Sequence, residues 1–461
     1  MWRVADDQAQ IISALEGMTG PRTAETVGRA VASLIHDGTL RPGSRLPTVR
    51  QVAHVCGVST GTIVAAWSTL RRDGFVETRR RGGTMVLGAG PSIRNESGAH
   101  GSVDWSARDL LSGSPDYAMQ PDLSAALLAG LSSSHELNRP GREYITEPLL
   151  SAVQAHWPFQ AQAWTAAGGG SEGLILATEA AASAGGVVAI EEPAMPGFLD
   201  TLSELNIQPV GLCRDSEGPL IRSLQEALEL EPVALVLQPE GSYAMEGSLS
   251  TARAADLARV LMNSPTRPWI IEDDGVGPLA VRQAASLGPF LPDHTVRVRS
   301  YCKAYGIDIR TCVIGGSEQL VAAIIDKRTH GVAMNSRILQ NTLAHLINSD
   351  EAKFAVAAAR DKYRTRRERL INALARQGLR AQAGDNSLVL WVEVSDENSA
   401  LISLARKGIV VGSGSKSFIG KHSRALLRVA IPQLPDEDEL AEELATRIAE
   451  ASCSRNREYL A

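Results

Sequence analysis

The fold of the N-terminal part is decided by residues 37–86, which read DGTLRPGSRLPTVRQVAHVCGVSTGTIVAAWSTLRRDGFVETRRRGGTMV. Thr48 can cap a helix that runs to Val55, and Ser59 can cap another, each placed just before a run with helical apolar spacing. Short apolar stretches on either side of an Arg- and Gly-rich turn predict a hairpin. The expected order is helix, helix, turn, helix and hairpin, over residues 24–37, 48–55, 56–58, 59–73 and 75–87. This order is the layout of a winged helix-turn-helix.

The charge of this stretch differs from that of the rest of the chain. Residues 21–88 hold ten Arg and no Lys against two Asp and two Glu, a net charge of +6, whereas the 461-residue chain carries −6. A basic module on an acidic body predicts an anionic partner for the N-terminal part. A solvated charged face is the simpler alternative.

DNA contacts are expected at three places in the module. The second helix of the motif enters the major groove with its first residues, here Ser59, Thr60 and Thr62. Arg50 begins the preceding helix, and the tip of the hairpin carries three consecutive arginines. The candidate DNA-binding residues are Arg50, Ser59, Thr60, Thr62, Arg79, Arg80 and Arg81. A basic winged domain that binds protein instead is the alternative.

The composition describes a folded protein of several domains. A chain of 49.1 kDa predicts two to four units of roughly 150 residues. No run reaches the ~18 apolar residues that span a bilayer, and the acidic, amphipathic N-terminus is not a signal peptide, which predicts a cytoplasmic protein. The five scattered cysteines predict neither a disulfide framework nor a zinc site. We expect a lead segment, a winged domain, a linker and a large C-terminal domain, over residues 1–20, 21–88, 89–104 and 105–461.

From residue 105 onward, apolar strand-like runs alternate with helical stretches, which predicts an α/β domain with a mainly parallel sheet. The expected strands are 187–190, 233–237, 269–271, 298–301, 312–314 and 388–394, and the expected helices include 171–182, 251–262 and one long stretch over about 326–377. Residues 168–173 satisfy GxGxxG before a helix, and Glu191 follows a strand, so a dinucleotide site is one reading of this region. The segment before the motif, QAQAWTAA (160–167), is a poor buried strand, which argues against that reading.

A second set of residues fits another cofactor. In chain order it comprises Gly169, Gly170, Ser171, Asp273, Ser300, Lys303 and Arg310. A glycine-rich helix start binds phosphate through its N–H groups, and hydroxyl and basic side chains can complete that grip. A carboxylate after a strand can pair with a pyridinium nitrogen, and an activated lysine can form a Schiff base. These are the parts of a pyridoxal 5′-phosphate (PLP) site, and the ordered set is far more specific than any one member.

Both parts resemble known families. Residues 37–86 are similar to the GntR-type winged helix, sharing Gly38, Leu40, Pro42, Gly43, Leu46, Pro47, Arg50, Val58, Ser59, Thr62, Leu70, Gly74 and Gly83. The family usually has Arg where this chain has Thr60, which implies a different operator preference. Residues 105–455 resemble the fold-type I aminotransferases through IIEDDG (270–275), SYCKAYGIDIR (300–310) and LLRVA (426–430).

The aminotransferase resemblance assigns roles to single residues. It implies that Lys303 forms the Schiff base, that Ser300 and Arg310 hold the phosphate, and that Asp273 binds the pyridinium nitrogen, with the adjacent Asp274 as the alternative. It also implies that Arg428 grips the carboxylate of a substrate or effector, since Arg binds carboxylates in bidentate fashion. A GntR-like head on an aminotransferase-like body resembles the MocR/GabR class of transcription regulators. That resemblance implies a homodimer with PLP, an amino compound or both as effector.

The chain departs from the aminotransferase pattern around the expected cofactor ring. In QPEGSYAMEGSLS (238–250), Tyr243 takes the place of a ring-contacting Asn. Gly275 stands where a Tyr is usual, and Met195 where an aromatic residue usually stacks. Two explanations stay open. Either the pocket binds PLP with rearranged contacts, Tyr243 supplying the phenol lost at Gly275, or it has drifted to another ligand or to none.

Three functions follow from these residues. The first is a dimeric DNA-binding transcription regulator that senses PLP or a PLP–amine adduct. The second is a working PLP-dependent aminotransferase with an appended DNA-binding domain, although the altered ring contacts argue against efficient turnover. The third is a regulator that has lost PLP and binds another metabolite. All three share the DNA-binding module.

Overall fold

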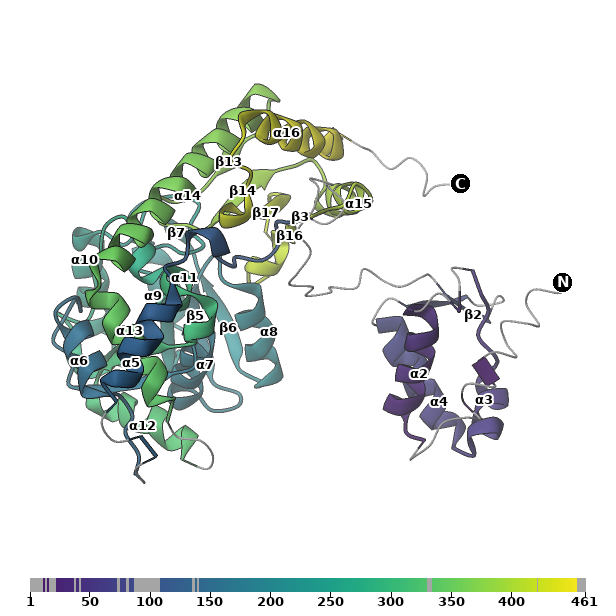
Figure 1. Cartoon of the computed structure of the whole chain (residues 1–461), viewed down its shortest axis with the longest axis horizontal. Helices are drawn as coiled ribbons and strands as arrows, with labels where there is room; N and C mark the ends of the chain where they lie inside the picture. The colour runs from purple at the N-terminus through teal and green to yellow at the C-terminus, as the bar shows by residue number, and fades with distance from the viewer. Residues whose placement is uncertain are drawn as a thin grey trace. The chain divides into compact units, whose positions relative to one another are not determined.

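The computed structural model describes residues 11–12, 15, 22–36, 39–40, 43–72, 75–79, 83–86, 108–134, 137–138, 141–329, 334–420 and 422–453. The chain divides into two compact units, Met1–Ser102 and Val103–Ala461 (Figure 1). Within the described part of the chain, every helix is too short or too polar to cross a membrane.

The N-terminal unit is the expected winged helix-turn-helix. Its elements are α2 (Ala24–His36), α3 (Val49–Cys56), α4 (Thr60–Arg72) and the antiparallel hairpin β1 (Val76–Arg79) and β2 (Gly83–Val86). Each bound lies within two residues of the sequence-based expectation. Val27 and Val31 of α2 pack on Ile63 and Trp67 of α4 in one apolar core.

Local signals fix the two helices of the DNA-binding motif. Thr48 caps α3 in a capping box, in which its hydroxyl accepts from Gln51 N while the Gln51 side chain accepts from the Thr48 backbone. Gly57 ends the helix in the left-handed conformation, with φ of 65°. At the start of α4, Thr62 N donates to Ser59 Oγ at 3.1 Å, so Ser59 is the predicted cap.

The C-terminal unit is built on a seven-stranded sheet. Its order is β4 (Ala163–Ala167), β12 (Cys312–Gly316), β11 (Thr295–Ser300), β10 (Trp269–Asp274), β9 (Ala234–Leu237), β5 (Val187–Glu191) and β6 (Gln208–Leu212). Only β12 runs antiparallel to its neighbours in this sheet, which confirms the mainly parallel expectation.

Helices cover both faces of this sheet, as successive strand residues point to opposite sides. One face packs against α7 (Gly170–Ala181), α8 (Pro196–Glu204) and α12 (Glu318–Arg328). The other packs against α9 (Ile221–Leu228) and α10 (Thr251–Met262). A further core joins α6 (Glu147–Gln154), α11 (Cys302–Tyr305), α13 (Arg337–Asn348) and α14 (Asp350–Arg376), and α5 (Leu123–Ser132) packs on α13.

A smaller layer follows the long helix α14. It consists of an antiparallel sheet with α15 (Glu397–Arg406) and α16 (Asp438–Cys453) beside it (Figure 1). The strand order is β13 (Ala381–Gln382), β14 (Val389–Glu393), β17 (Leu426–Ala430) and β16 (Gly412–Ser413). Short pairs β3 (Arg108–Asp109) with β15 (Ile409–Val410) and β7 (Arg214–Asp215) with β8 (Gly218–Pro219) complete the strands. Single 3₁₀ turns lie at Tyr117–Met119, Gly277–Leu279 (η3), Pro292–His294, Ile307–Ile309, Ser415–Ser417 and Ile431–Gln433.

The structure revises two sequence-based expectations for this unit. The helical stretch expected over about 326–377 is divided among the end of α12, α13 and α14, and Ser336 and Ser349 cap the two later helices. The segment 160–167, expected to be a poor buried strand, contains β4, whose Thr165–Ala167 end is buried. Since β4 is an edge strand paired antiparallel to β12, the glycines after it do not open the central parallel strand of a dinucleotide fold.

Candidate functional site

A cavity of about 310 Å³ lies where β10 and β11 end and α7 begins. This volume suits a small ligand, since such pockets span about 300–1,000 Å³. The cavity brings together every residue that the sequence singled out for the cofactor. They are Gly169, Gly170, Ser171, Tyr243, Asp273, Ser300, Lys303 and Arg310, which are spread over more than a hundred positions of the chain.

One end of the cavity is shaped to hold an anion. The first turn of α7 begins at Gly170, and its free N–H groups and helix dipole favour negative charge. A Cβ on Gly170 would lie 2.8 Å from the Ser300 Cβ, so glycine is needed for this close approach. Gly169 has φ of 119°, and a Cβ there would lie 4.0 Å from the guanidinium carbon of Arg310. Helix start, hydroxyl and guanidinium thus converge on one spot.

A carboxylate and an amine both line the cavity and influence each other electrostatically. Asp273 is half-buried near the end of β10, and burial raises its pKa to about 6, although Lys303 pulls it down. Burial lowers the pKa of the half-buried Lys303, and Asp273 opposes that shift. A buried lysine with a lowered pKa is a better nucleophile at neutral pH than an exposed one.

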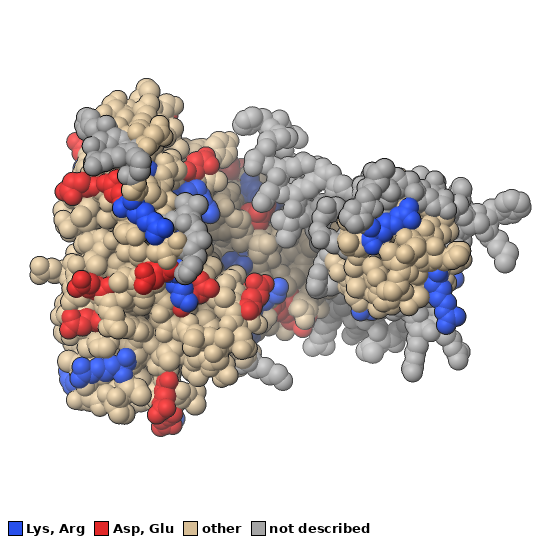
Figure 2. All heavy atoms as spheres, turned by 90° about the horizontal axis from the view of Figure 1, so that it is seen from below, with Lys and Arg blue, Asp and Glu red and all other residues tan. Residues whose placement is uncertain are grey.

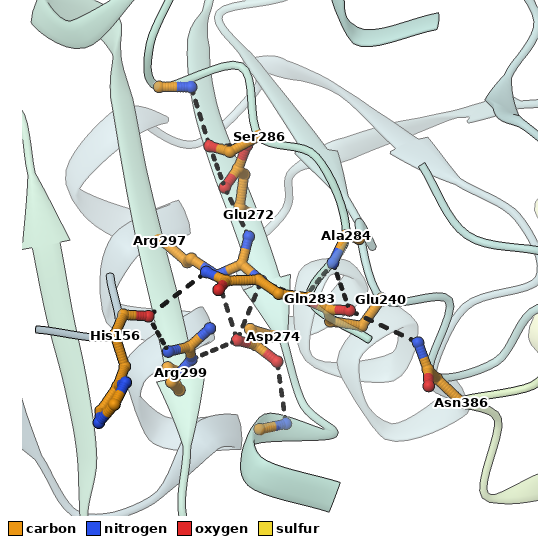
Figure 3. A network of polar contacts seen from close by, with 12 residues as sticks. His156, Glu240, Glu272, Asp274, Gln283, Ala284, Ser286, Arg297, Arg299 and Asn386 are labelled. Carbon is orange, nitrogen blue, oxygen red and sulfur yellow. Dashed lines mark hydrogen bonds and ion pairs between the residues drawn. The ribbon is translucent and has the colours of Figure 1, made fainter. Parts of the chain in front are cut away.

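The neighbouring Asp274 points away from this cavity. Its Oδ2 accepts from Arg299 Nε at 2.6 Å and from Arg297 Nε at 3.1 Å, and its Oδ1 accepts from Gly277 N at 2.9 Å (Figure 3). These bonds hold the pKa of Asp274 down at about 2 despite burial, with Arg297 the main cause. Strand alternation therefore gives Asp273 to the cavity and Asp274 to a buried ion-pair network.

The residues that depart from the aminotransferase pattern also line the cavity. Met195, Tyr243 and Gly275 all contribute to its wall. Burial raises the pKa of Tyr243, and Asp273 adds to the rise, while Arg428 opposes it. Trp391 Nε1 donates to the Tyr243 carbonyl at 2.9 Å, which anchors this loop to β14.

Sequence reasoning missed Ser242, which is also part of the wall. Its hydroxyl donates to Gln238 Oε1 at 2.9 Å and lies 3.8 Å from the position of a Cβ on Gly275. The same Gln238 oxygen accepts from Tyr243 N at 3.2 Å. A buried glutamine that orients a loop has no periodic or spacing signal, so the sequence offered nothing that would have identified it.

Arg428 lies behind the cavity wall and does not line it. It sits in the middle of β17, and its Nη1 donates to the Leu111 carbonyl at 3.4 Å, next to the wall residue Ser112. Its buried Nε has no hydrogen-bond partner within the described chain. A Cβ on Gly412 would lie 2.7 Å from Arg428 Nη2, so that glycine makes room for the guanidinium.

The candidate DNA-binding residues occupy the start of α4 and its surroundings. Arg50, Ser59 and Thr60 are exposed. The hydroxyls of Ser59 and Thr62 lie 2.9 Å apart and bind each other while capping the helix. Arg79 ends β1, its side chain lies outside the described part, and Arg80 and Arg81 lie outside the described residues altogether. Figure 2 shows basic side chains on the N-terminal unit, and basic and acidic ones mixed on the C-terminal unit.

The described residues contain no cluster of three or more His, Cys, Asp or Glu that could hold a metal ion. All five cysteines are free. The cavity offers the amine of Lys303, the carboxylate of Asp273, the thiol of Cys302 and the anion-binding helix start.

Two family models match separate parts of the chain. The model of bacterial regulatory proteins of the gntR family matches residues 23–86. The model of class I and II aminotransferases matches residues 278–448, which include Lys303, Arg310 and Arg428.

Relatives with both parts are transcription regulators by name. The vitamin B6 salvage pathway transcriptional repressor PtsJ of Salmonella typhimurium is 26% identical over 429 residues, covering 91% of this chain and 97% of that protein. The HTH-type transcriptional regulator TauR of Rhodobacter capsulatus is 24% identical and covers 83% of this chain and 87% of TauR.

Solved structures share the fold of the C-terminal unit. Kynurenine aminotransferase of Pyrococcus horikoshii has a TM-score of 0.65 at 16% identity, covering 75% of this chain and 90% of that one. Aspartate aminotransferase of Thermus thermophilus has a TM-score of 0.64 at 18% identity, covering 75% and 92%. The chain thus joins a GntR-type winged helix-turn-helix to a fold-type I aminotransferase domain, the composition of MocR-type transcriptional regulators.

Proposed function

We propose that this protein is a DNA-binding transcriptional regulator whose C-terminal unit binds PLP and responds to an amino compound. The observation that carries the proposal is the single cavity in which a glycine-rich helix start, Asp273, Lys303 and Arg310 meet. Support for the DNA-binding half comes from the winged unit and from two relatives whose names describe transcriptional regulators. Both relatives match this chain over most of their own length.

The residues present fit PLP. The N–H groups at the start of α7, the Ser300 hydroxyl and Arg310 would hold the phosphate, in a cradle that a Cβ on Gly170 would fill. The Asp273 carboxylate would accept a hydrogen bond from the pyridinium N–H and so keep the ring nitrogen protonated. The positive ring would in turn give this carboxylate a cationic partner. When bound, PLP supplies an electrophilic carbon that reacts with amines. Lys303 is the amine in reach, and its lowered pKa raises the fraction of neutral, reactive amine at a given pH.

An amino acid effector would be oriented by Arg428. A guanidinium binds a carboxylate through two parallel hydrogen bonds, and the buried Nε of Arg428 has no other acceptor among described residues. Nη1 of Arg428 donates to the Leu111 carbonyl, next to the lining residue Ser112, so an effector carboxylate would compete with this bond. A ligand that displaces the Leu111–Ser112 segment from Arg428 could favour one of two states of the unit.

The proposal includes a cytoplasmic homodimer. Leu127, Leu128 and Leu131 of α5 are 40%, 67% and 46% exposed, and a second copy of the chain would cover such a surface. A dimer would also place two recognition helices on one DNA duplex, as helix-turn-helix proteins with two half-sites require.

The test uses the full-length chain and a DNA duplex that it selects from a random pool. Fluorescence anisotropy would measure the affinity for this duplex with and without PLP, and absorbance would follow covalent binding of PLP to lysine in the visible range. We expect wild type to show the absorbance band and a PLP-dependent change in DNA affinity. Lys303→Ala should lose both, whereas Lys327→Ala, a change of an exposed lysine on α12, should keep both.

The outcomes separate the candidate functions. If no duplex is selected, the regulator proposal fails. If DNA binds but PLP produces no absorbance band, the unit has drifted to another ligand. Sustained production of a keto acid from an amino acid donor would instead identify a working aminotransferase.

A further inference from the structure

A second cavity, of about 420 Å³, lies in the C-terminal unit apart from the one described above. It is lined by α6, η3, the end of β11, α11, the end of α13 and the first three turns of α14. The segment around β11 separates the two cavities. Ser300 and Lys303 line the first, whereas Arg299, Tyr301 and Tyr305 line the second.

One wall of the second cavity is aromatic. The rings of Tyr301 and Tyr305 stack with centroids 6.3 Å apart and planes 16° from parallel. Apolar side chains complete this wall from three helices, namely Val153, Ile347 and Val356. A flat apolar body would be favoured against such a surface.

Three cationic side chains also line this cavity. They are Arg299, Lys353 and Arg360, against Glu240 as the single acidic side chain among the lining residues. Both oxygens of Glu240 are already engaged, since Oε1 accepts from Arg297 Nη2 at 2.6 Å and Oε2 accepts from Ala284 N at 3.0 Å (Figure 3). Arg299 and Lys353 are paired with Asp274 and Asp350, at 2.6 and 3.1 Å, which leaves Arg360 as the lining cation without an ion pair among the described residues.

Arg360 is the cation with an unmet hydrogen bond. Its Nη2 donates to the Pro278 carbonyl at 2.9 Å, but its Nε is buried and has no partner among the residues that the structure describes. Burial raises the pKa of Tyr305 to about 12, and the positive charge of Arg360 opposes that rise. An unpaired donor on a charged group is costly to bury, and an anion in the cavity would satisfy it.

We propose that the second cavity is a binding site for a small organic anion, a carboxylate or phosphate on a flat apolar body. The anion is held by Arg360, and the body rests on Tyr301 and Tyr305. Arg299 contributes positive charge but keeps its own partners, Asp274 Oδ2 at 2.6 Å and the His156 carbonyl at 2.9 Å. None of its residues lines the first cavity, so the site does not require PLP to be bound.

The test is calorimetric titration of the full-length, PLP-free protein with benzoate and with phenyl phosphate, which carry the two anion types on one ring. We expect at least one of them to bind with Kd at or below about 1 mM. Arg360→Met keeps the aliphatic stem and should weaken that binding by about tenfold or more. Arg364→Met, one turn further along α14 and outside the cavity lining, should bind as wild type does.

Two more variants keep the proposal falsifiable if Arg360→Met fails to fold. Ala357→Phe places a ring at the exposed rim of the cavity without removing a charge and should block binding. Arg310→Met removes the anion site of the first cavity and should leave binding intact. The proposal is overturned if wild type binds neither probe at about 10 mM, if Ala357→Phe binds as wild type, or if Arg310→Met alone abolishes binding.

Discussion

Replacing Asp273 by asparagine is expected to stabilise the PLP-free protein at neutral to basic pH. Burial in the cavity raises the pKa of this carboxyl from 3.8 to about 6. Because the folded pKa lies above the unfolded one, the native state binds more protons between the two values. Stability therefore falls as the pH rises from about 4 to about 6 and stays level above that. A shift of about two pKa units corresponds to about 3 kcal/mol, and asparagine, which does not ionise, removes up to that cost.

The measurement is urea unfolding of the C-terminal unit in the full-length protein, at about pH 4 and about pH 8. Asp273→Asn should match wild type at the lower pH and exceed it at the higher one. Asp308→Asn, a change of an exposed residue close to Lys303 in the chain, should match wild type at both. An equal gain at both pH values, or no gain at the higher one, would refute the reasoning. With PLP present the order should reverse, because asparagine cannot pair with the pyridinium nitrogen.

Substitutions at three further residues test other parts of the structure. Gly170→Ala brings a Cβ to 2.8 Å from the Ser300 Cβ, so overpacking should cost about 1–3 kcal/mol in urea unfolding and weaken PLP binding; unchanged PLP affinity would contradict the cradle. Arg297→Met removes a fully buried guanidinium from three carboxylates and should cost about 3–5 kcal/mol, whereas a neutral effect would show that the network is not held by this residue. Ser59→Ala should lower the stability of the N-terminal unit by about 1 kcal/mol in a thermal melt, because it removes the oxygen that caps α4. Ser59→Asp should restore the stability, because its carboxylate can accept the same hydrogen bond.

Much of the fold could be predicted because local signals set the limits of its elements. Thr48 and Ser59 cap the helices that the sequence placed after them. Helix α10 has the predicted bounds, Thr251–Met262, since a capping Ser250 precedes a run with regular apolar spacing. Buried parallel strands such as β5 and β9 read as short apolar runs.

Sequence-based bounds failed where a polar residue caps a helix, because apolar periodicity does not distinguish a capping serine from a surface serine. Ser336 and Ser349 each begin a helix, yet a serine inside a polar, amphipathic stretch looks like one more surface residue. The edge strand β4 lacks the β-branched run of a central strand, because it has one neighbour and its outer end is half-buried.

The first cavity could be predicted as a set of residues, because a family motif fixes their order along the chain. Its electrostatics could not. Whether Asp273 or Asp274 faces the cavity depends on the register of β10 against β11, which places Asp274 beside Arg299. The second cavity could not be predicted, since its residues come from α6, η3, β11, α11, α13 and α14. The motif at residues 300–310 pointed to Lys303 and not to Tyr301 and Tyr305.

The two cavities share one segment, residues 299–305, and this predicts that their ligands are linked. Lys303 faces one ligand, while Tyr301 and Tyr305 face the other from the same turn. A ligand that fixes this turn changes the position of Lys303, so benzoate or phenyl phosphate should alter the affinity for PLP. Linkage requires that PLP then alters the affinity for that probe by the same factor. Two titrations of wild type, each with the other ligand saturating, measure the two factors. Equal factors that differ from one would establish coupling between the two cavities. At a probe concentration that saturates wild type but not Arg360→Met, the variant should show a smaller effect of the probe on PLP affinity. Two factors of one in wild type would show that the turn is rigid enough to isolate the cavities.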